Sequence, residues 1–217
     1  MEIFIVDSAN LEREVDRAVS LLRAGEVIVI PTDTVYGLAA DARNETAIVK
    51  VFELKQRASE KALPIFVSSF EMLKDVAVIT DDRVRTFLAR VWPGAVTAVL
   101  VAREGLPHAL NGGSPTIAVR IPDNIFIQSI IEKLGGPITG TSANVSEHAT
   151  GLTAGEVANE FSRQPLQPAA IFDSGPSPCG PSTIADCTMW PPKVLRVGAI
   201  SAQDIELITK EINANKN

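Results

Sequence analysis

A strand-like apolar run passes directly into hydroxyl residues in the stretch IVIPTDTVYGL, residues 28–38. The β-branched residues 28–30 are typical of a buried strand, and Pro31 cannot continue its hydrogen-bond ladder. In open α/β sheets, ligands bind beyond the carboxyl ends of strands, so Thr32, Asp33 and Thr34 are placed to hydrogen-bond a ligand. A turn in which these side chains merely cap the next element fits the spacing equally well.

Working outward from this stretch, short apolar runs alternate with helical patterns. Runs of strand length occupy Glu26–Ile30, Pro64–Val67, Ala95–Ala102 and Thr116–Ile121. Apolar residues at helical spacing mark Asn10–Arg23, Glu45–Arg57, Asp81–Val91 and Asn124–Leu134. Asp7 or Ser8 is placed to cap the first helix, and capping boxes predict two later helix starts after Thr153 and Ser201. The alternation predicts a mixed α/β chain.

Nothing before Ile200 has the composition of a linker, so we expect one domain over residues 1–212 and a polar tail over residues 213–217. The Pro/Gly/Ser-rich stretch Ser174–Ser182 lies between apolar runs and is predicted to be a functional loop.

The charge balance excludes a generally nucleic-acid-binding surface. With 20 basic and 26 acidic residues among 217, the net charge is −6 and the isoelectric point is near 5.0. Any bound anion must therefore meet a local cluster of cations. The cysteines, Cys179 and Cys187, are too few for a disulfide framework, and no signal-like or membrane-length apolar segment occurs. We expect a cytoplasmic protein.

Candidate cations and hydroxyls follow several predicted elements. Lys55 and Arg57 close a helical pattern, although cations are expected at a helix C-terminus in any case. Arg120 shares a strand face with Thr116 and Ala118, which leaves it room to bind a carboxylate, but a surface arginine would look the same. The run TGTSANVS, residues 139–146, offers side-chain and backbone donors to a phosphate or an adenine, or forms a polar turn.

Other familiar devices are missing from the sequence. Neither a Walker-type phosphate loop nor a Gly-x-Gly-x-x-Gly motif occurs, and His108 and His148 have no Cys or acidic residues at metal-ligand spacing.

In their order along the chain, these segments resemble the YrdC-like threonylcarbamoyl-AMP synthases, from about Ser8 to Ile200. The matching motifs are PTDTVYGL (31–38), KQR (55–57), TIAVRIP (116–122), TSANVS (141–146), PSTI (181–184) and LRVG (195–198). The sequence departs from the family pattern at Ala39, at Ala58 and at Glu147-His148. The last departure concerns the loop that closes over the nucleotide.

The resemblance implies a short, single-domain α/β form with a twisted mixed sheet, flanked by helices, around a deep cavity. It implies a nucleotidyltransferase that makes threonylcarbamoyl-AMP and pyrophosphate from L-threonine, bicarbonate or carbon dioxide, and ATP with magnesium. A separate complex then transfers the threonylcarbamoyl group to tRNA. Carried onto this chain, Lys55 and Arg57 would be catalytic. Thr32, Arg120, Thr141 and Ser182 would bind threonine. ATP would be held by Lys55, Arg57, Thr116, Ser142, the Ala143 backbone, Asn144 and Arg196.

A paralogous nucleotide- or RNA-binding module of the same fold, without synthase activity, is the alternative. The intact KQR and SAN motifs and the acidic composition weigh against it, and we expect weak or no direct RNA binding.

Overall fold

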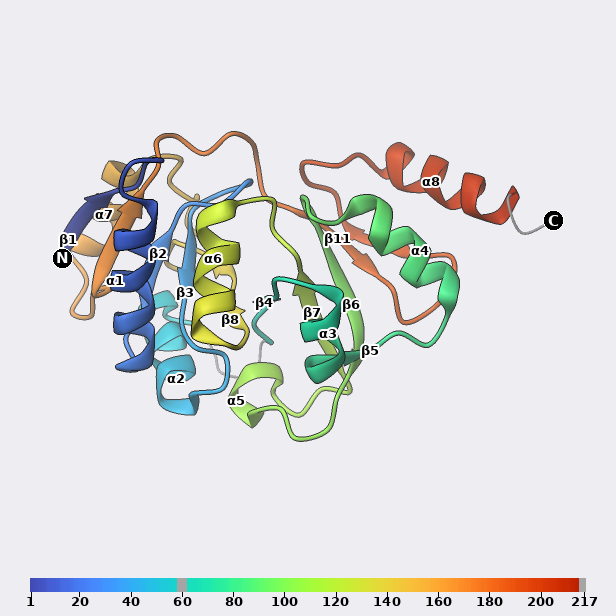
Figure 1. Ribbon diagram of the computed structural model, residues 1–217, viewed down its shortest axis with the longest axis horizontal. Coiled ribbons are helices and arrows are strands. Elements are labelled where there is room, and N and C mark those ends of the chain that lie inside the picture. Colours follow the sequence, from blue (N-terminus) through green and yellow to red (C-terminus); the bar gives the residue numbers. More distant parts are fainter. Residues whose placement is uncertain (58–61, 215–217) are drawn as a thin grey trace.

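The strand at Ile28–Ile30 lies in one of two β-sheets (Figure 1). The computed structural model describes residues 1–57 and 62–214. The first sheet has the strand order β1 (Glu2–Ile5), β10 (Ala170–Asp173), β2 (Ile28–Ile30), β3 (Gly37–Ala39) and β9 (Thr141–Ser142). β10 pairs in parallel with β1 and β2, whereas β3 is antiparallel to both β2 and β9.

The second sheet has the order β12 (Lys193–Arg196), β11 (Thr183–Asp186), β6 (Val96–Ala102), β7 (Thr116–Arg120), β4 (Ile65–Phe66) and β8 (Ile138–Thr139), with β5 (Ala77–Val78) paired to β6. The expected mixed α/β architecture is confirmed, but the strands form two sheets instead of the single expected sheet. The chain changes sheets at Gly140, between β8 and β9. A side chain is excluded there, because an added Cβ would lie 2.5 Å from the Phe66 ring.

Eight helices surround the sheets in the described part of the chain: α1 (Leu11–Arg23), α2 (Glu45–Lys55), α3 (Phe70–Val76), α4 (Asp82–Val91), α5 (His108–Asn111), α6 (Ile125–Leu134), α7 (Ala154–Ser162) and α8 (Ala202–Ala214). Figure 1 shows α1 beside α6 at one end of the molecule and α4 beside α8 at the other. None of the described helices is long and apolar enough to cross a membrane.

Two helix starts follow the predicted capping boxes. Thr153 caps α7 as predicted, whereas Asn124 was expected inside a helix and instead caps α6 by accepting the Ile127 N–H. The full capping box forms at Ser201, whose hydroxyl accepts the Asp204 N–H while the Asp204 carboxylate accepts the Ser201 N–H. The prediction for α1 is wrong. The Asp7 carboxylate accepts the N–H groups of Ala9 and Asn10, which precede the helix, and Ser8 does not cap it.

At the other end of the chain, Asn213 and Ala214 belong to α8 rather than to a polar tail, and Asn213 accepts the indole N–H of Trp190. Residues 215–217 of the predicted tail lie outside the described residues, as does Ala58.

One hydrophobic core joins the two sheets. Its buried residues include Val29 and Leu38 from the first sheet and Ile65 and Ile117 from the second. A smaller cluster lies beneath α1 and α6. Because the larger core is continuous across both sheets, they are held in fixed positions, and the polar residues at their meeting point form one site.

Candidate active site

A cavity of about 740 Å³ lies where the two sheets meet. Its lining comes from the segment after β2, the end of α2, β6, β7, β9 and the segment before β11. All the predicted site residues except Thr116 and Ala143 line it, and these are Thr32, Lys55, Arg57, Arg120, Thr141, Ser142, Asn144, Ser182 and Arg196. Residues more than 160 positions apart in the sequence, such as Thr32 and Arg196, thus share one cavity.

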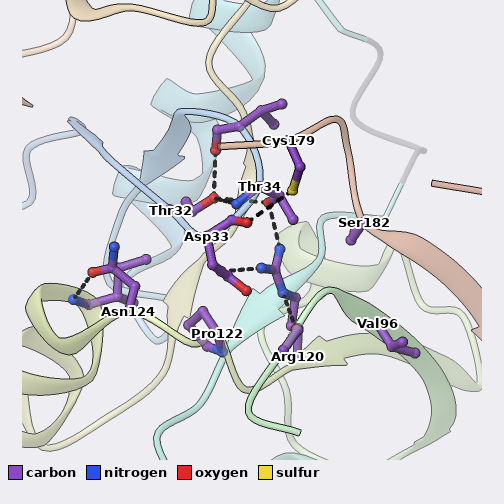
Figure 2. Close-up of polar contacts among 12 residues, drawn as sticks. Thr32, Asp33, Thr34, Val96, Arg120, Pro122, Asn124, Cys179 and Ser182 are labelled. Carbon is purple, nitrogen blue, oxygen red and sulfur yellow. Dashed lines mark hydrogen bonds and ion pairs between the residues drawn. The ribbon is translucent and has the colours of Figure 1, made fainter. Parts of the chain in front are cut away.

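The two hydroxyls after β2 form a rigid corner of the cavity (Figure 2). The Thr32 hydroxyl donates to the Val35 carbonyl at 2.7 Å and accepts the Thr34 N–H at 2.9 Å. The Thr34 hydroxyl accepts Nη1 of Arg120 at 2.8 Å. The turn interpretation of this stretch is confirmed, and the same two residues also line the cavity, so ligand binding by them stays a prediction.

Arg120 ends β7 and is almost fully buried. Its Nε donates to the Gly94 carbonyl at 2.8 Å, and its Nη2 donates to the Asp33 carboxylate (Figure 2). Three of the five guanidinium N–H groups are thus in use, which leaves two for a ligand. Burial lowers the pKa of Arg120, while the Asp33 carboxylate acts in the opposite direction. From the sequence, Asp33 was expected either to face a ligand or to shape a turn, and this ion pair was missed.

Ser182 and Thr97 meet across the neighbouring strands. Their hydroxyl oxygens are 2.8 Å apart, and both residues line the cavity. Thr97 was missed in the sequence, although a buried threonine within the apolar run of β6 was a usable signal. Arg196 is the last residue of β12, and its Nη2 donates to the Ser182 carbonyl at 2.8 Å.

Lys55 is buried, and each of its three donors has an oxygen acceptor. Its Nζ lies 2.7 Å from the Ser142 carbonyl, 2.9 Å from the Asn144 carbonyl and 3.1 Å from Oδ1 of Asn144. Burial and the nearby Arg57 lower the pKa of Lys55 to about 8. We expected Lys55 to contact the nucleotide directly. Here the ammonium group is committed to the turn at residues 142–144, which it holds against the end of α2.

The turn is closed further by its own side chains. The Ser142 hydroxyl donates to Oδ1 of Asn144 at 2.6 Å, and Nδ2 of Asn144 donates to the His148 carbonyl at 2.6 Å. Glu147 has a φ of 72°, in the left-handed region that favours glycine, and it lines the cavity. At this departure from the family pattern, the chain therefore keeps a strained turn at the cavity edge.

Arg57, unlike Lys55, has guanidinium N–H donors without a hydrogen-bond partner among the described residues. Its Nη2 donates to the Ala62 carbonyl at 3.2 Å, and its Nε is buried without a partner among the described residues. Burial lowers the pKa of Arg57. A buried, unpaired guanidinium N–H at a cavity wall is the donor that an incoming oxyanion would satisfy.

The cavity does not reach Thr116 or Ala143. Thr116 shares the face of Arg120, as predicted, but it lies four residue steps away along the strand, about 13 Å, and its hydroxyl lies 3.0 Å from that of Ser114. The backbone N–H of Ala143 is donated to the Tyr36 carbonyl at 2.8 Å, so it is not available to a nucleotide. Of the TIAVR strand, Ala118 and Arg120 line the cavity.

The predicted functional loop, Ser174–Ser182, is tied to the corner at residues 32–36. The Tyr36 hydroxyl lies 2.8 Å from Oδ1 of Asp173 and 2.7 Å from the Gly175 carbonyl, and these two acceptors share its single hydrogen. Burial raises the pKa of Tyr36. Further along, the Cys179 thiol donates to the Asp33 carbonyl at 3.2 Å (Figure 2). These contacts fix the loop that carries Ser182 to the cavity.

Together these residues define an α/β protein with a cavity between two sheets, lined in the described part of the chain by hydroxyls, amides and four cations. The chain belongs to the Sua5/YciO/YrdC family, because that family's model, described as "Telomere recombination", matches residues 20–198.

Relatives of known name share most of this chain. It is 36% identical over 196 residues to the threonylcarbamoyl-AMP synthase of Pyrococcus abyssi, covering 90% of this chain and 57% of that protein. It is 34% identical over 205 residues to the Bacillus subtilis enzyme of the same name, covering 94% and 58%. The chain thus spans less than two thirds of the length of these relatives.

Among solved structures, the fold is similar to P. abyssi Sua5 complexed with L-threonine, with a TM-score of 0.89 and 34% identity. That match covers 96% of this chain and 61% of the other. The expected resemblance is confirmed.

Proposed function

We propose that this protein is an L-threonylcarbamoyladenylate synthase, a nucleotidyltransferase that uses L-threonine, bicarbonate or carbon dioxide, and ATP. The observation that carries the proposal is one cavity in which Arg120, with its hydroxyl neighbours, lies opposite the Lys55-held turn at residues 142–144. The names of the P. abyssi and B. subtilis relatives, and the L-threonine bound to P. abyssi Sua5, support it.

The cavity divides into two ends under this proposal. Arg120, Thr32, Thr141 and Ser182 form the amino-acid end, where the two remaining guanidinium N–H groups bind the threonine carboxylate. Arg57, Arg196, Ser142 and Asn144 form the nucleotide end, and Lys55 serves it by holding the turn. Thr116 and Ala143 do not line the cavity, and under this proposal they contact neighbouring residues of the fold instead of the substrates.

The chemistry needs positioning more than a nucleophilic side chain. The threonine nitrogen, as the free amine, attacks the carbon of carbon dioxide and loses a proton to solvent, which gives the carbamate. From bicarbonate, the same bond formation expels water. A carbamate oxygen then attacks the α-phosphorus of ATP, and pyrophosphate leaves. Both reactants are anions, so cations and dipoles must offset their repulsion. Holding the two reactants together supplies much of the remaining rate enhancement.

Magnesium fits this site as a companion of the triphosphate. Among residues 1–57 and 62–214, no group of three His, Cys, Asp or Glu side chains could hold a metal ion. Magnesium usually keeps several waters and binds through substrate phosphates with one or two carboxylates. The hydroxyls of Ser142 and Ser146 and the carboxylate of Glu147 line the cavity and supply oxygen donors of the suitable kind. The metal would neutralise phosphate charge as pyrophosphate departs.

The product is a reactive mixed anhydride, so we propose that it passes to a separate complex that transfers the threonylcarbamoyl group to tRNA. We place the protein in the cytoplasm with that acceptor.

The decisive experiment is a mass spectrum of the products formed from ATP, threonine and bicarbonate. Threonylcarbamoyl-AMP and pyrophosphate are expected, and omission of threonine or bicarbonate should abolish both. Pyrophosphate release that is indifferent to these omissions would rule out the reaction. Serine should react less well, because a lost methyl contact is worth about 1 kcal/mol.

A further inference from the structure

The four cations of the cavity differ in their counter-charges. Arg120 forms an ion pair with the Asp33 carboxylate. Lys55, Arg57 and Arg196 form no ion pair with any acidic side chain among the described residues. Glu147 also lines the cavity, but it is exposed and pairs with none of them. Among the described residues, a fixed carboxylate counter-charge is therefore paired with Arg120 and with none of the other three cavity cations.

The Asp33–Arg120 pair is built into the wall rather than formed by chance at the surface. The side chains are 14% and 3% exposed. The Arg120 guanidinium is fixed on its other sides by Gly94 and Thr34, and it lies 5.5 Å from the centre of the Phe66 ring. In Figure 2, Asp33 and Ser182 lie on opposite sides of the Arg120 guanidinium, and Thr34 lies above it.

We propose that Asp33 makes the amino-acid end of the cavity electrically neutral, so that this end selects the net-neutral zwitterion of an amino acid over phosphate. This inference rests on the proposed function for the identity of the two ends. A carboxylate and a phosphate compete for the same guanidinium fork. In an acidic protein whose substrate carries a triphosphate, an unpaired Arg120 would be a second phosphate site.

Phosphate and a zwitterionic amino acid differ in net charge, and this difference decides how each responds to Asp33. A phosphate of charge near −2 bound to Arg120 would be repelled by the Asp33 carboxylate held on the same guanidinium, in a buried setting with little screening. A zwitterion brings its own positive charge, so its total charge is not opposed. Removal of the Asp33 charge should therefore favour phosphate much more than it favours threonine.

The test is a calorimetric titration of the purified chain, without ATP, with L-threonine and with inorganic phosphate. In the unmodified protein, millimolar phosphate should not displace threonine. Asp33→Asn keeps the shape and removes the charge, and it should bind phosphate about tenfold more tightly, in competition with threonine. Asp33→Glu should behave like the unmodified protein. Thr34→Val is the matched control, since it removes a neutral acceptor of Arg120 and should gain no phosphate affinity.

The double variant Asp33→Asn with Arg120→Gln locates the effect, because it should lose the gained phosphate site. This arm needs neither threonine nor turnover, so it reads the charge pairing even if the chain proves not to be a synthase. No gain of phosphate binding in Asp33→Asn, or an equal gain in Thr34→Val, overturns the proposal. If Asp33→Asn does not fold, the unmodified protein decides, since displacement of its threonine by phosphate would contradict a neutral site.

Discussion

Lys55 and Arg120 show how burial changes what a single cation can do. Both are held by several oxygen acceptors, and both lie at the wall of the cavity. Lys55 spends its donors on the backbone of a turn, whereas Arg120 keeps two N–H groups for a ligand. A compact ammonium suits the first task and a planar fork suits the second.

Arg120→Lys is expected to raise the KM for threonine about tenfold or more and to leave the KM for ATP nearly unchanged. Lysine cannot reproduce contacts to Gly94, Thr34 and Asp33 together with a ligand carboxylate. Steady-state kinetics with each substrate varied in turn measure both constants, and threonine amide should be a poor substrate of the unmodified protein. A weaker ATP interaction with unchanged threonine saturation would assign Arg120 to the nucleotide.

The KM for ATP should rise as the pH increases through about 8, where Lys55 loses its proton. Above this pH the neutral amine donates two hydrogen bonds to three acceptors, and the cavity loses a positive charge. Lys55→Met is the comparison, because its KM for ATP should be high and should not change across the same pH range.

The rise in the KM for ATP should not reflect unfolding of the protein. A free lysine has a pKa of 10.5, so between about 8 and 10.5 the unfolded chain binds more protons than the folded chain. The contribution of Lys55 to the free energy of unfolding therefore increases with pH in that window. Denaturant titrations at the two ends of the window separate the effects. A pH-independent KM for ATP in the unmodified protein would contradict this role.

At the scale of elements, loops rather than strands carry the site, and each loop is tied to another by a buried donor. Tyr36 joins the segment before β3 to the loop after β10, and Lys55 joins the end of α2 to the turn in and after β9. These links make the cavity rigid, although most of its lining lies outside regular structure.

Tyr36→Phe should destabilise the protein by about 1 kcal/mol, because it removes the phenol hydrogen bond to the half-buried oxygens of Asp173 and Gly175, although Asp173 keeps the Gly175 N–H. The loop that carries Ser182 would loosen, so the KM for threonine should increase as well. Asp173→Asn is the milder matched change, since an amide oxygen still accepts from the phenol. Denaturant unfolding and threonine kinetics are the two measurements, and an unchanged midpoint in Tyr36→Phe would show that the link is not needed.

At the scale of the whole molecule, an acidic protein encloses a basic cavity. The net charge is −6, yet Lys55, Arg57, Arg120 and Arg196 converge on one cavity. Small anions can thus be drawn into the interior while a long polyanion is repelled by the exterior.

Duplex RNA should therefore bind weakly and without strong dependence on sequence. Fluorescence anisotropy with a labelled duplex, titrated at low and at physiological salt, measures this. A tight complex that persists at physiological salt would favour the RNA-binding alternative. RNA binding would not by itself decide whether the proposed synthase reaction takes place, so the mass spectrum of the products remains an independent check.

Much of the fold was predictable because its signals are local. The apolar runs mark β2, β4, β6 and β7 to within about two residues, and Asn124, Thr153 and Ser201 mark helix starts. These signals depend on side-chain spacing and on caps a few residues away, so the sequence contains them directly. The order of the six motifs likewise identified the family that the comparisons confirm.

The tertiary structure alone decided what depends on residues far apart in the chain. The division into two sheets depends on pairings between strands far apart in the chain, and the close passage of Gly140 past Phe66 between β8 and β9 is likewise not recorded by any local pattern. The pairing of Asp33 with Arg120, the commitment of Lys55 to the turn at residues 142–144, and the distance of Thr116 from the cavity have the same origin. Sequence determined which side chains carry charge and hydroxyls along this chain. Long-range packing determined which charges are neutralised, which donors are already used and which still face the cavity, because burial and counter-charge are properties of the assembled fold.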